Sequence, residues 1–327
     1  MEDYSISDHF NPSTHEGVLP VRVLQFNMLK WFEEVSPTLL EEVLGEVNYR
    51  GLQRGIGYHI AIAPITDAAE IDGKKKIHLY ENYLQFLWGV SYAITTLFQE
   101  GFVKPVKAGT YTGVTDLSDP FVRKAYAVFD ASIELFTKCD PSKHYALPNP
   151  EKETPLDVKL IRQVNGVFSA ASAFILMHEV GHQFFGHLDD LPVTDDYLKD
   201  KGQYEDEFAA DDYALEWLQK GKAPSDVLDD TNAMGVIAAM TTFLLMDPQL
   251  TGDDEHPPPH MRMTHALEEL GTTDENLWAC ACIGLRLWAA HTKYSFTVPS
   301  GDDLHGYKDL FYIVVDKMTD ATGSPAA

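Results

Sequence analysis

The sequence predicts a mainly α-helical fold with a small β-sheet (α+β). Most of the chain places apolar residues at helical spacing, and one short region alternates between apolar and polar residues. The chain has 327 residues, of which 45% are hydrophobic, and this is enough to bury a sizeable core. We expect a flexible N-terminal arm at residues 1–20, a single domain at residues 21–318 and a disordered tail at residues 319–327.

The strands are expected in the N-terminal part of this domain, residues 21–155. Residues 58–63 alternate and are rich in isoleucine, which predicts a strand. Asp72-Gly73 is a turn signal, and residues 76–80 are the candidate partner strand. The connection between the two candidates is long for a tight hairpin.

Helical spacing of apolar residues predicts the other elements in chain order. The predicted helices cover residues 24–47 (with Pro37 as a break between two helices), 82–99, 121–138, 156–188, 204–219, 225–246, 261–270, 274–291 and 303–318. The segments 101–120, 140–155 and 187–202 are predicted as loops. The helix at residues 156–188 is apolar around most of its surface, so we expect it to be buried in the helical part, residues 156–318.

The charge of the chain argues against two classes of partner. The sequence contains 50 acidic and 25 basic residues, a net charge of -25. A surface this negative repels phosphate backbones and anionic membranes, so we expect no nucleic-acid partner. The same charge favours a well-solvated surface.

The cysteines and the apolar runs favour a cytoplasmic protein. The three cysteines, Cys139, Cys280 and Cys282, are too few and too poorly spaced for a disulfide framework, so we interpret them as buried or free thiols. The N-terminus has no signal-peptide pattern. The longest apolar runs, residues 167–177 and 233–246, are shorter than the roughly 18 residues of a membrane span.

The most informative pattern lies in residues 174–187, which read FILMHEVGHQFFGH. His178 and His182 are four residues apart, and at roughly 100° per residue they lie about 40° apart on a helix. Both imidazoles then project from one face and can share a metal ion, while Glu179 can reach a water on that ion. His-Glu-x-x-His is the arrangement of zinc peptidases, but a five-residue pattern also occurs by chance.

A third protein ligand is therefore the test of the motif, since a hydrolytic zinc has three protein ligands and an open position. In one class of enzymes the third ligand is a histidine six residues after the second. Leu188 occupies that position here, and His187 falls one residue short. His187 is also about 140° around the helix from His182, so it cannot complete the site without a break in the helix. We expect it to hydrogen-bond at the helix end.

Another class takes a glutamate from a later helix, and residues 203–217, QYEDEFAADDYALEW, supply one. Glu207 and Asp211 lie four residues apart and share a helix face, and the small residues Ala209 and Ala210 allow close approach to the first helix. We predict that Glu207 binds the metal and that Asp211 accepts a hydrogen bond from a ligand histidine, which fixes its tautomer. Glu205 is the alternative to Glu207.

A further candidate element is residues 255–263, EHPPPHMRM, which opens a helix after a proline-rich loop. His256 can stabilise the oxyanion of a tetrahedral intermediate, or close the open metal position as a gate. His260 or His265 can take this part instead. Arg262 can pair with an active-site carboxylate or with a substrate carbonyl.

Taken together, these segments resemble the gluzincin metallopeptidases, and the resemblance covers residues 158–263. The matching residues are His178-Glu179-x-x-His182-x-x-x-x-His187, Glu207-x-x-Ala-Asp211 and His256-Pro257-x-x-x-x-Arg262. The pattern is most similar to the HtpX and CAAX-prenyl-protease signature, and more loosely to soluble bacterial gluzincins of the phage-exclusion and stress-response type. The resemblance implies a zincin-like fold and Zn2+ bound by His178, His182 and Glu207, with Glu179 as the base. HtpX-like enzymes span membranes, so the chain resembles a soluble branch of the family.

The sequence thus predicts a cytoplasmic zinc metalloprotease that acts on a protein or peptide substrate. The expected reaction is Glu179-assisted attack of a zinc-bound water on a peptide bond. In this architecture an edge strand aligns an extended peptide, and residues 58–63 and 76–80 are the candidates. Two alternatives stay open: a zinc hydrolase of a non-protein amide, and a non-catalytic zinc-containing sensor or scaffold.

Overall fold

The structure is a computed structural model that describes much of the chain from residue 57 onward. The described residues are 57–59, 68–72, 74, 76–113, 115–138, 145, 147–150, 158–187, 196–220, 230–254, 256–271, 273–295 and 305–323. The predicted arm at residues 1–20, the predicted helices within residues 24–47 and Cys139 lie outside these residues.

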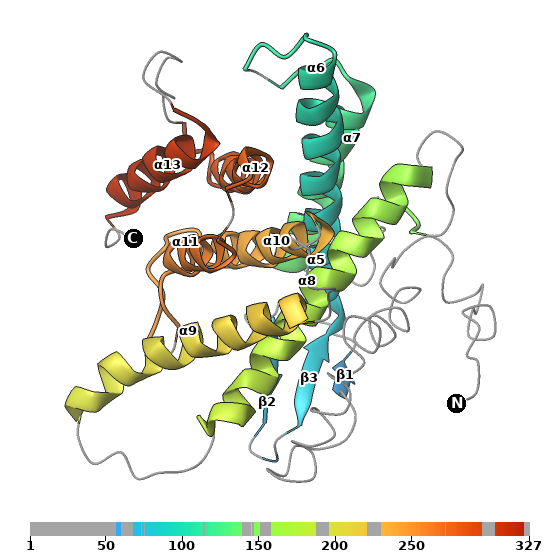
Figure 1. The fold of residues 1–327 in the computed structure, drawn as a ribbon. Coiled ribbons are helices and arrows are strands. Elements are labelled where there is room, and N and C mark those ends of the chain that lie inside the picture. Colours follow the sequence, from blue (N-terminus) through green and yellow to red (C-terminus); the bar gives the residue numbers. More distant parts are fainter. Residues whose placement is uncertain are drawn as a thin grey trace, which may run out of the picture.

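The described part of the chain is mainly helical with one small sheet, as the sequence predicts (Figure 1). The strands are β1 (Gly57–His59), β2 (Ala69–Ile71) and β3 (Ile77–Tyr80). The helices are α5 (Glu81–Thr96), the π-helical η1 (Leu97–Val103), α6 (Lys104–Lys107), α7 (Pro120–Lys138), α8 (Val158–Phe185), α9 (Asp196–Lys220), α10 (Asp230–Met246), α11 (Pro259–Glu269), α12 (Glu275–Thr292) and α13 (Tyr307–Thr322).

The sheet has the strand order β1-β3-β2. Strand β1 contains the first two residues of the strand predicted at residues 58–63, of which residues 60–63 lie outside the described part of the chain. It pairs with β3, the strand predicted at residues 76–80, but in parallel. The antiparallel partner of β3 is β2, a strand that the sequence did not predict. The turn at Asp72 therefore joins β2 to β3, and three residues of alternation in β2 were too few to give a periodic signal.

Three predicted loop or tail segments contain helix. Residues 101–120 were predicted as loop, but Gly101 lies within η1, and Pro105 lies in the first turn of α6, where its missing N–H costs little. Helix α9 begins at Asp196, inside the loop predicted at residues 187–202. Helix α13 continues to Thr322, because Gly323 with φ of 72° provides the C-terminal cap; residues 319–322, predicted as tail, are helical.

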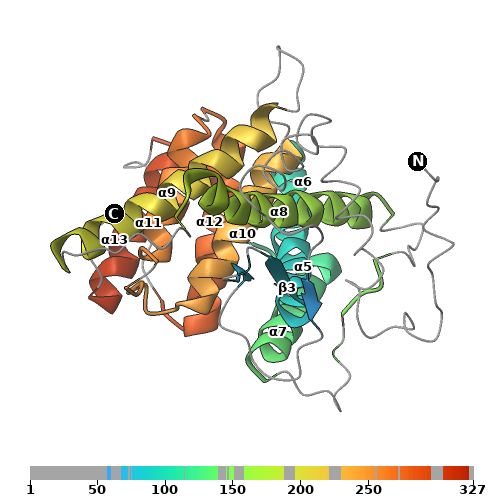
Figure 2. The ribbon, with the colours of Figure 1, turned by 90° about the horizontal axis from the view of Figure 1, so that it is seen from below.

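Helix α8 is the central element of the fold and packs against α5, α9 and α10. Figure 2 shows it running across the molecule, with α9 on one side and α5 on the other. Contact with α10 is close at Gly235, where an added Cβ would lie 2.6 Å from the Cβ of Ala170. The residues of α8 from Val167 to Gly181 are all buried, which confirms the predicted buried helix.

Among the described residues, α8 is also the one helix long and apolar enough to cross a membrane, by length and composition alone. In its most apolar window of 18 residues, 78% are buried inside the protein. The core helix of a globular domain passes the same test. The absence of a membrane span and the cytoplasmic location therefore stay predictions.

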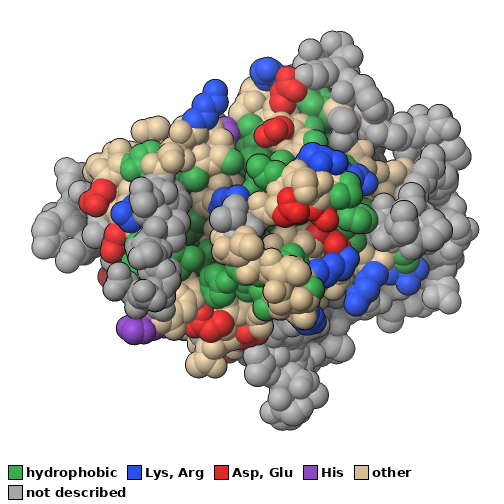
Figure 3. Space-filling model, turned by 90° about the horizontal axis from the view of Figure 1, so that it is seen from above, with side chains coloured by type: hydrophobic (Ala, Val, Ile, Leu, Met, Phe, Trp, Pro, Cys, Tyr) green, Lys and Arg blue, Asp and Glu red, His purple; other side chains and the backbone are tan. Residues whose placement is uncertain are grey.

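A cavity lies between η1, α7, α12 and α13, at the end of the molecule away from the sheet. Its volume is about 560 Å³, and its lining is largely apolar and aromatic. The ring of Phe102 contacts Tyr111 and Tyr307 edge-on, with centroids 5.3 and 5.2 Å apart. Cys282 also lines this cavity, and burial raises the pKa of its thiol to about 12. Figure 3 shows the molecule from this end, where hydrophobic side chains reach the surface among acidic and basic ones.

Candidate metal centre and active site

The histidine motif lies near the C-terminal end of α8, where the chain is helical as predicted. The ring centroids of His178 and His182 are 4.7 Å apart, and their Nε2 atoms are 3.0 Å apart. His178 and Glu179 are both buried. The spacing of four residues therefore brings the two Nε2 atoms to one point.

Glu207 reaches the same point from α9. Its Oε2 lies 3.4 Å from His178 Nε2, and its Oε1 lies 3.1 Å from His182 Nε2. One ligand atom from each of these three residues lies within 4.8 Å of the others, and no other such group of histidine, cysteine and acidic side chains occurs among the described residues. Glu205, the alternative considered from the sequence, is exposed.

Small residues on both helices allow this approach. A Cβ added to Gly181 would lie 3.1 Å from Ala210 Cα and 3.3 Å from Tyr213 Cβ, so a glycine is needed for the observed distance between α8 and α9. The sequence indicated the small residues on α9 but not their counterpart, Gly181, inside the histidine motif.

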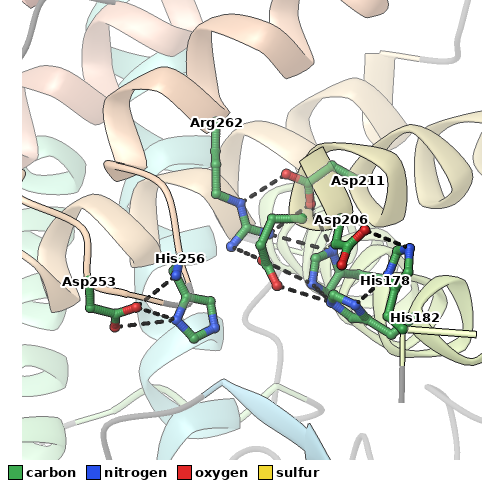
Figure 4. A network of polar contacts seen from close by, with 9 residues as sticks. His178, His182, Asp206, Asp211, Asp253, His256 and Arg262 are labelled. Carbon is green, nitrogen blue, oxygen red and sulfur yellow. Dashed lines mark hydrogen bonds and ion pairs between the residues drawn. The ribbon is translucent and has the colours of Figure 1, made fainter. Parts of the chain in front are cut away.

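Asp211 and Arg262 hold the buried side of the site together (Figure 4). Asp211 Oδ1 lies 2.9 Å from His178 Nδ1, the ring nitrogen that faces away from Glu207. The Nε and Nη2 atoms of Arg262, from α11, donate hydrogen bonds of 2.9 and 2.7 Å to the two carboxylate oxygens of Asp211. Arg262 Nη1 lies 3.0 Å from Glu207 Oε2. Arg262 thus pairs with carboxylates of the site, the first of the two partners proposed for it.

An aromatic side chain covers this guanidinium. The ring centroid of Phe243, in α10, is 4.7 Å from Arg262 Cζ, a cation–π distance. Asp211 has no exposed surface, and 5% of Arg262 is exposed. Such a pair is well ordered but costly to break, because a lone charge would be left in the interior.

The buried charges control one another's ionisation. Burial alone would lower the pKa of His178, but the carboxylates of Glu207 and Asp211 raise it to about 10. Burial likewise opposes ionisation of Glu207, yet His178 and Arg262 hold the pKa of Glu207 far below its usual range. Arg262 and His178 lower the pKa of Asp211 in the same way. Burial lowers the pKa of His182.

Glu179 differs from the other carboxyl groups because burial raises its pKa to about 7. The positive charges of His178 and Arg262 oppose this shift without cancelling it. A carboxyl group with a pKa near neutrality can both accept and return a proton under physiological conditions.

The residues at this site fit a divalent metal ion. Two imidazole nitrogens and a carboxylate form a donor set, and Glu207 Oε2 is buried without a hydrogen bond of good geometry. Ionised Glu179, Glu207 and Asp211 with Arg262 leave an excess of two negative charges, which one divalent cation balances. The ion would replace the proton on His178, since a ligand nitrogen must be unprotonated.

His256 lines a cavity of about 430 Å³ together with His178, Glu179 and Arg262. Asp253 orients this histidine: its Oδ1 accepts a hydrogen bond of 2.7 Å from the backbone N–H of His256 and lies 3.1 Å from its Nδ1. Figure 4 shows the Asp253–His256 pair set apart from the group formed by His178, His182, Asp211 and Arg262.

The other two histidine candidates lie elsewhere. His260 is fully buried in α11, and His265 Nε2 lies 2.7 Å from Asp212 Oδ1 on α9. Neither lines this cavity, so of the three candidates only His256 lines it together with Glu179.

The family model described as Peptidase U49 matches residues 77–282, more than half of the chain. The chain belongs to the Peptidase U49 family. No curated protein and no solved structure matches the chain.

The Peptidase U49 match runs from β3 into α12 and includes every residue of the candidate site. A peptidase family and a group that can hold a metal ion support the coarse part of the sequence resemblance. The gluzincin signature, the zinc ion and the residue roles stay predictions.

Several residues that shape the site were not predicted. Phe243 and Gly181 have no motif of their own and become visible through contacts made across the fold, whereas Asp253 contacts a histidine three residues away. The acidic pair Asp253-Asp254 before His256 was the one available signal, since an aspartate three residues before a histidine can bond its backbone N–H. The contacts of His187 are treated below.

Proposed function

We propose that this member of the Peptidase U49 family is a zinc-dependent metallopeptidase. The observation that supports the proposal best is the convergence of His178 Nε2, His182 Nε2 and a Glu207 carboxylate oxygen beside a buried glutamate, Glu179. A purely structural metal site has no use for a base at that position. The peptidase family favours a protein or peptide substrate over a non-protein amide.

The donor set favours zinc among divalent ions. Two imidazoles and one carboxylate are typical ligands of catalytic zinc, whereas calcium and magnesium prefer oxygen ligands alone. Bound zinc would supply a polarised water and a Lewis acid for the scissile carbonyl. Asp211 would keep His178 in the tautomer that presents Nε2, because it faces Nδ1 at 2.9 Å.

Glu179 would act as the general base and then as the general acid. It lies next to His178 at the cavity wall, and burial gives it a pKa of about 7, so proton uptake and return are balanced near neutral pH. It would take the proton from the attacking water and deliver it to the leaving amine.

In its doubly protonated form, His256 would donate its Nε2–H to the carbonyl oxygen as negative charge develops there. Asp253 engages its Nδ1 at 3.1 Å, which leaves Nε2 as the atom available to a substrate in the cavity. Arg262 already contacts two carboxylates, so we assign it the role of holding Asp211 and Glu207 in place.

Strand β2 would align the substrate. The cavity is lined by Ala68 and Ala69, at the start of β2, and β2 packs beside α8. Within the described residues β2 pairs only with β3, so its other edge can bind an extended peptide. We prefer β2 to the two strands proposed from the sequence, since β3 is the central strand and β1 lies on the side of β3 away from β2.

The decisive experiment is Glu179→Gln. The variant should bind zinc as the wild type does but lose hydrolysis of a peptide library generated from a whole proteome, by a factor of about 10² or more. Bound zinc is measured by elemental analysis and cleavage by mass spectrometry of new termini. Retained turnover in this variant would refute the role of Glu179.

The matched control is Glu205→Gln, because Glu205 is an exposed glutamate on α9. It makes the same chemical change near the site and should alter neither zinc content nor turnover. If the wild type bound zinc but cleaved no peptide, the non-protein amide would become the better hypothesis. If it bound zinc but offered no exchangeable metal position to hydroxamate inhibitors, a structural or sensory role would become the better hypothesis.

A further inference from the structure

Among the described residues, no carboxylate contacts the outer ring nitrogen of His182, in contrast to His178. Its Nδ1 lies 3.0 Å from the Nδ1 of another histidine, His187. The Nε2 of His187 in turn lies 3.1 Å from Asp206 Oδ1, on α9. The row His182–His187–Asp206 thus leads from the candidate metal ligand to an aspartate side chain that is 45% exposed.

A break in the helix makes this contact. On a continuous helix His187 would point about 140° away from His182. Helix α8 ends at Phe185, and Gly186 adopts φ of 77°, a left-handed conformation that favours glycine. The chain then folds back, and the backbone N–H of His187 donates a hydrogen bond of 3.0 Å to the carbonyl of His182.

The distances allow one consistent set of protons. If His182 binds the ion through Nε2, its neutral ring carries a proton on Nδ1, which it can donate to His187 Nδ1. His187 then carries its own proton on Nε2 and donates it to Asp206. Each nitrogen in the row has one role, as the outer partners of metal-ligating histidines require.

We propose that His187 and Asp206 are positioning residues that orient His182 toward the metal ion. The inference rests on the proposed metal centre. The two ligand histidines would then be oriented by different means: His178 by a buried aspartate and arginine, and His182 by a histidine and an aspartate near the surface.

Aromatic packing fixes the intermediate ring. Phe185 stacks on His187 with centroids 5.5 Å apart and an angle of 18° between the planes. Phe185 also contacts Tyr213 of α9 edge-on, at 5.9 Å. A surface histidine that served only to cap the helix would need neither the stacked ring nor the contact with Asp206.

The chain contains a matched control pair. His265 and Asp212 form the same type of contact, at 2.7 Å, and Asp212 lies on α9 with 47% exposure, close to that of Asp206. Neither belongs to the group that can hold a metal ion. Asp206→Asn and Asp212→Asn therefore make the same change on the same helix, and His187→Ala is matched by His265→Ala.

The test measures metal binding rather than turnover. Zinc affinity is determined by competition with a chelator, and the geometry of the site by the visible absorption spectrum of the cobalt-substituted protein. His187→Ala should lower zinc affinity by about 10- to 100-fold and change the cobalt spectrum, the range usual for outer partners of a metal ligand. Asp206→Asn should cause a smaller loss in the same direction.

His187→Asn should recover much of the affinity, because the asparagine amide places a hydrogen-bonding atom close to the position of imidazole Nδ1. If His187→Ala folds poorly, Asp206→Asn and His187→Asn decide the matter. The proposal fails if all three variants bind zinc within about twofold of their matched controls and leave the cobalt spectrum unchanged. A wild-type protein that binds no zinc would instead overturn the proposed function itself.

Discussion

Two aspartate–histidine pairs in this molecule have the same length and different surroundings. Asp211 Oδ1 lies 2.9 Å from His178 Nδ1 in the candidate metal centre, and Asp72 Oδ2 lies 2.9 Å from His78 Nε2 in the small sheet. The side chain of Asp211 has no exposed surface, whereas that of Asp72 is 33% exposed. Equal contact distances therefore need not mean equal energies.

The two aspartates are also held by different kinds of contact. Asp72 accepts hydrogen bonds of 2.8 and 3.0 Å from the backbone N–H groups of Lys74 and Lys76, so its partners lie within six residues. Asp211 is held by Arg262, 51 residues away, and by His178 on a third helix. The first arrangement organises a turn, and the second joins α8, α9 and α11 into one site.

The largest expected effect follows from breaking the buried pair. Asp211→Ala leaves Arg262 in the interior without its bidentate partner, so the free energy of unfolding should fall by about 3–5 kcal/mol. Urea denaturation in the presence of a chelator measures this without a contribution from bound metal. Asp212→Ala, at the neighbouring position, removes an exposed contact and should cost about 1 kcal/mol or less. Similar losses in both variants would show that burial does not distinguish them.

A second prediction concerns the pH dependence of stability. Burial raises the pKa of Glu179 to about 7, so the folded state binds a proton more tightly there than the unfolded state does. The resulting stability is complete below the ordinary carboxyl pKa and is lost as pH rises through 7. In chelator, the wild type should lose about 3 kcal/mol relative to Glu179→Gln between pH 4.5 and 8.

The difference between these two proteins cancels the titration of groups that they share, such as His178. Added zinc should reduce the difference, because a nearby cation favours the ionised carboxylate. If the free energy of unfolding of the wild type differed from that of Glu179→Gln by the same amount at every pH, the Glu179 carboxyl group would be solvated and the prediction would be wrong.

The third prediction tests the contact between α8 and α9. Gly181→Ala would place a Cβ 3.1 Å from the backbone of Ala210, so α9 must move and the free energy of unfolding should fall by about 1–3 kcal/mol. Glu207 lies one turn before Ala210, so zinc affinity should fall as well. On the same helix, Gly166→Ala meets only a methyl group of Thr231 at 3.1 Å and should be neutral or slightly stabilising. If the two variants lost the same amount of unfolding free energy and zinc affinity, Gly181 would not set the spacing between α8 and α9.

The same contrast between long-range and local contacts explains what the sequence could predict. The spacing of His178 and His182, and of Glu207 and Asp211, depends only on helix geometry, so the pattern alone indicated which side chains share a face. The structure then brought the two faces together. Phe243 could not be found this way, because its contact with Arg262 depends on how α10 and α11 meet.

The errors have local physical causes. Strand β2 is three residues long and is held by pairing with β3, so it has little periodicity of its own. His187 was placed on the far side of α8 because the helix was assumed to continue, but Gly186 ends it. A glycine directly before the histidine was the available signal, since glycine is the usual residue where a helix terminates in a left-handed conformation.

The smallest effect is expected at the surface turn. The hydrogen bond with His78 and those from the backbone hold the pKa of Asp72 at about 2, so its contribution is present above the ordinary carboxyl pKa and is lost as pH falls through 2. Asp72→Ala should accelerate hydrogen exchange of the Lys76 amide and leave global unfolding nearly unchanged. Asp72→Asn keeps the acceptor for the backbone N–H groups and should protect that amide, but without dependence on acidic pH.

A functional consequence separates the turn from the metal centre. Since β2 borders the cavity through Ala69, loosening the β2–β3 turn should weaken substrate binding and raise KM, with kcat and zinc affinity little changed. Asp211→Ala should lower zinc affinity because it acts on His178. If Asp72→Ala reduced zinc affinity as strongly as Asp211→Ala, the small sheet would contribute to the metal centre itself, and the two aspartate–histidine pairs would not be the independent elements that their surroundings indicate.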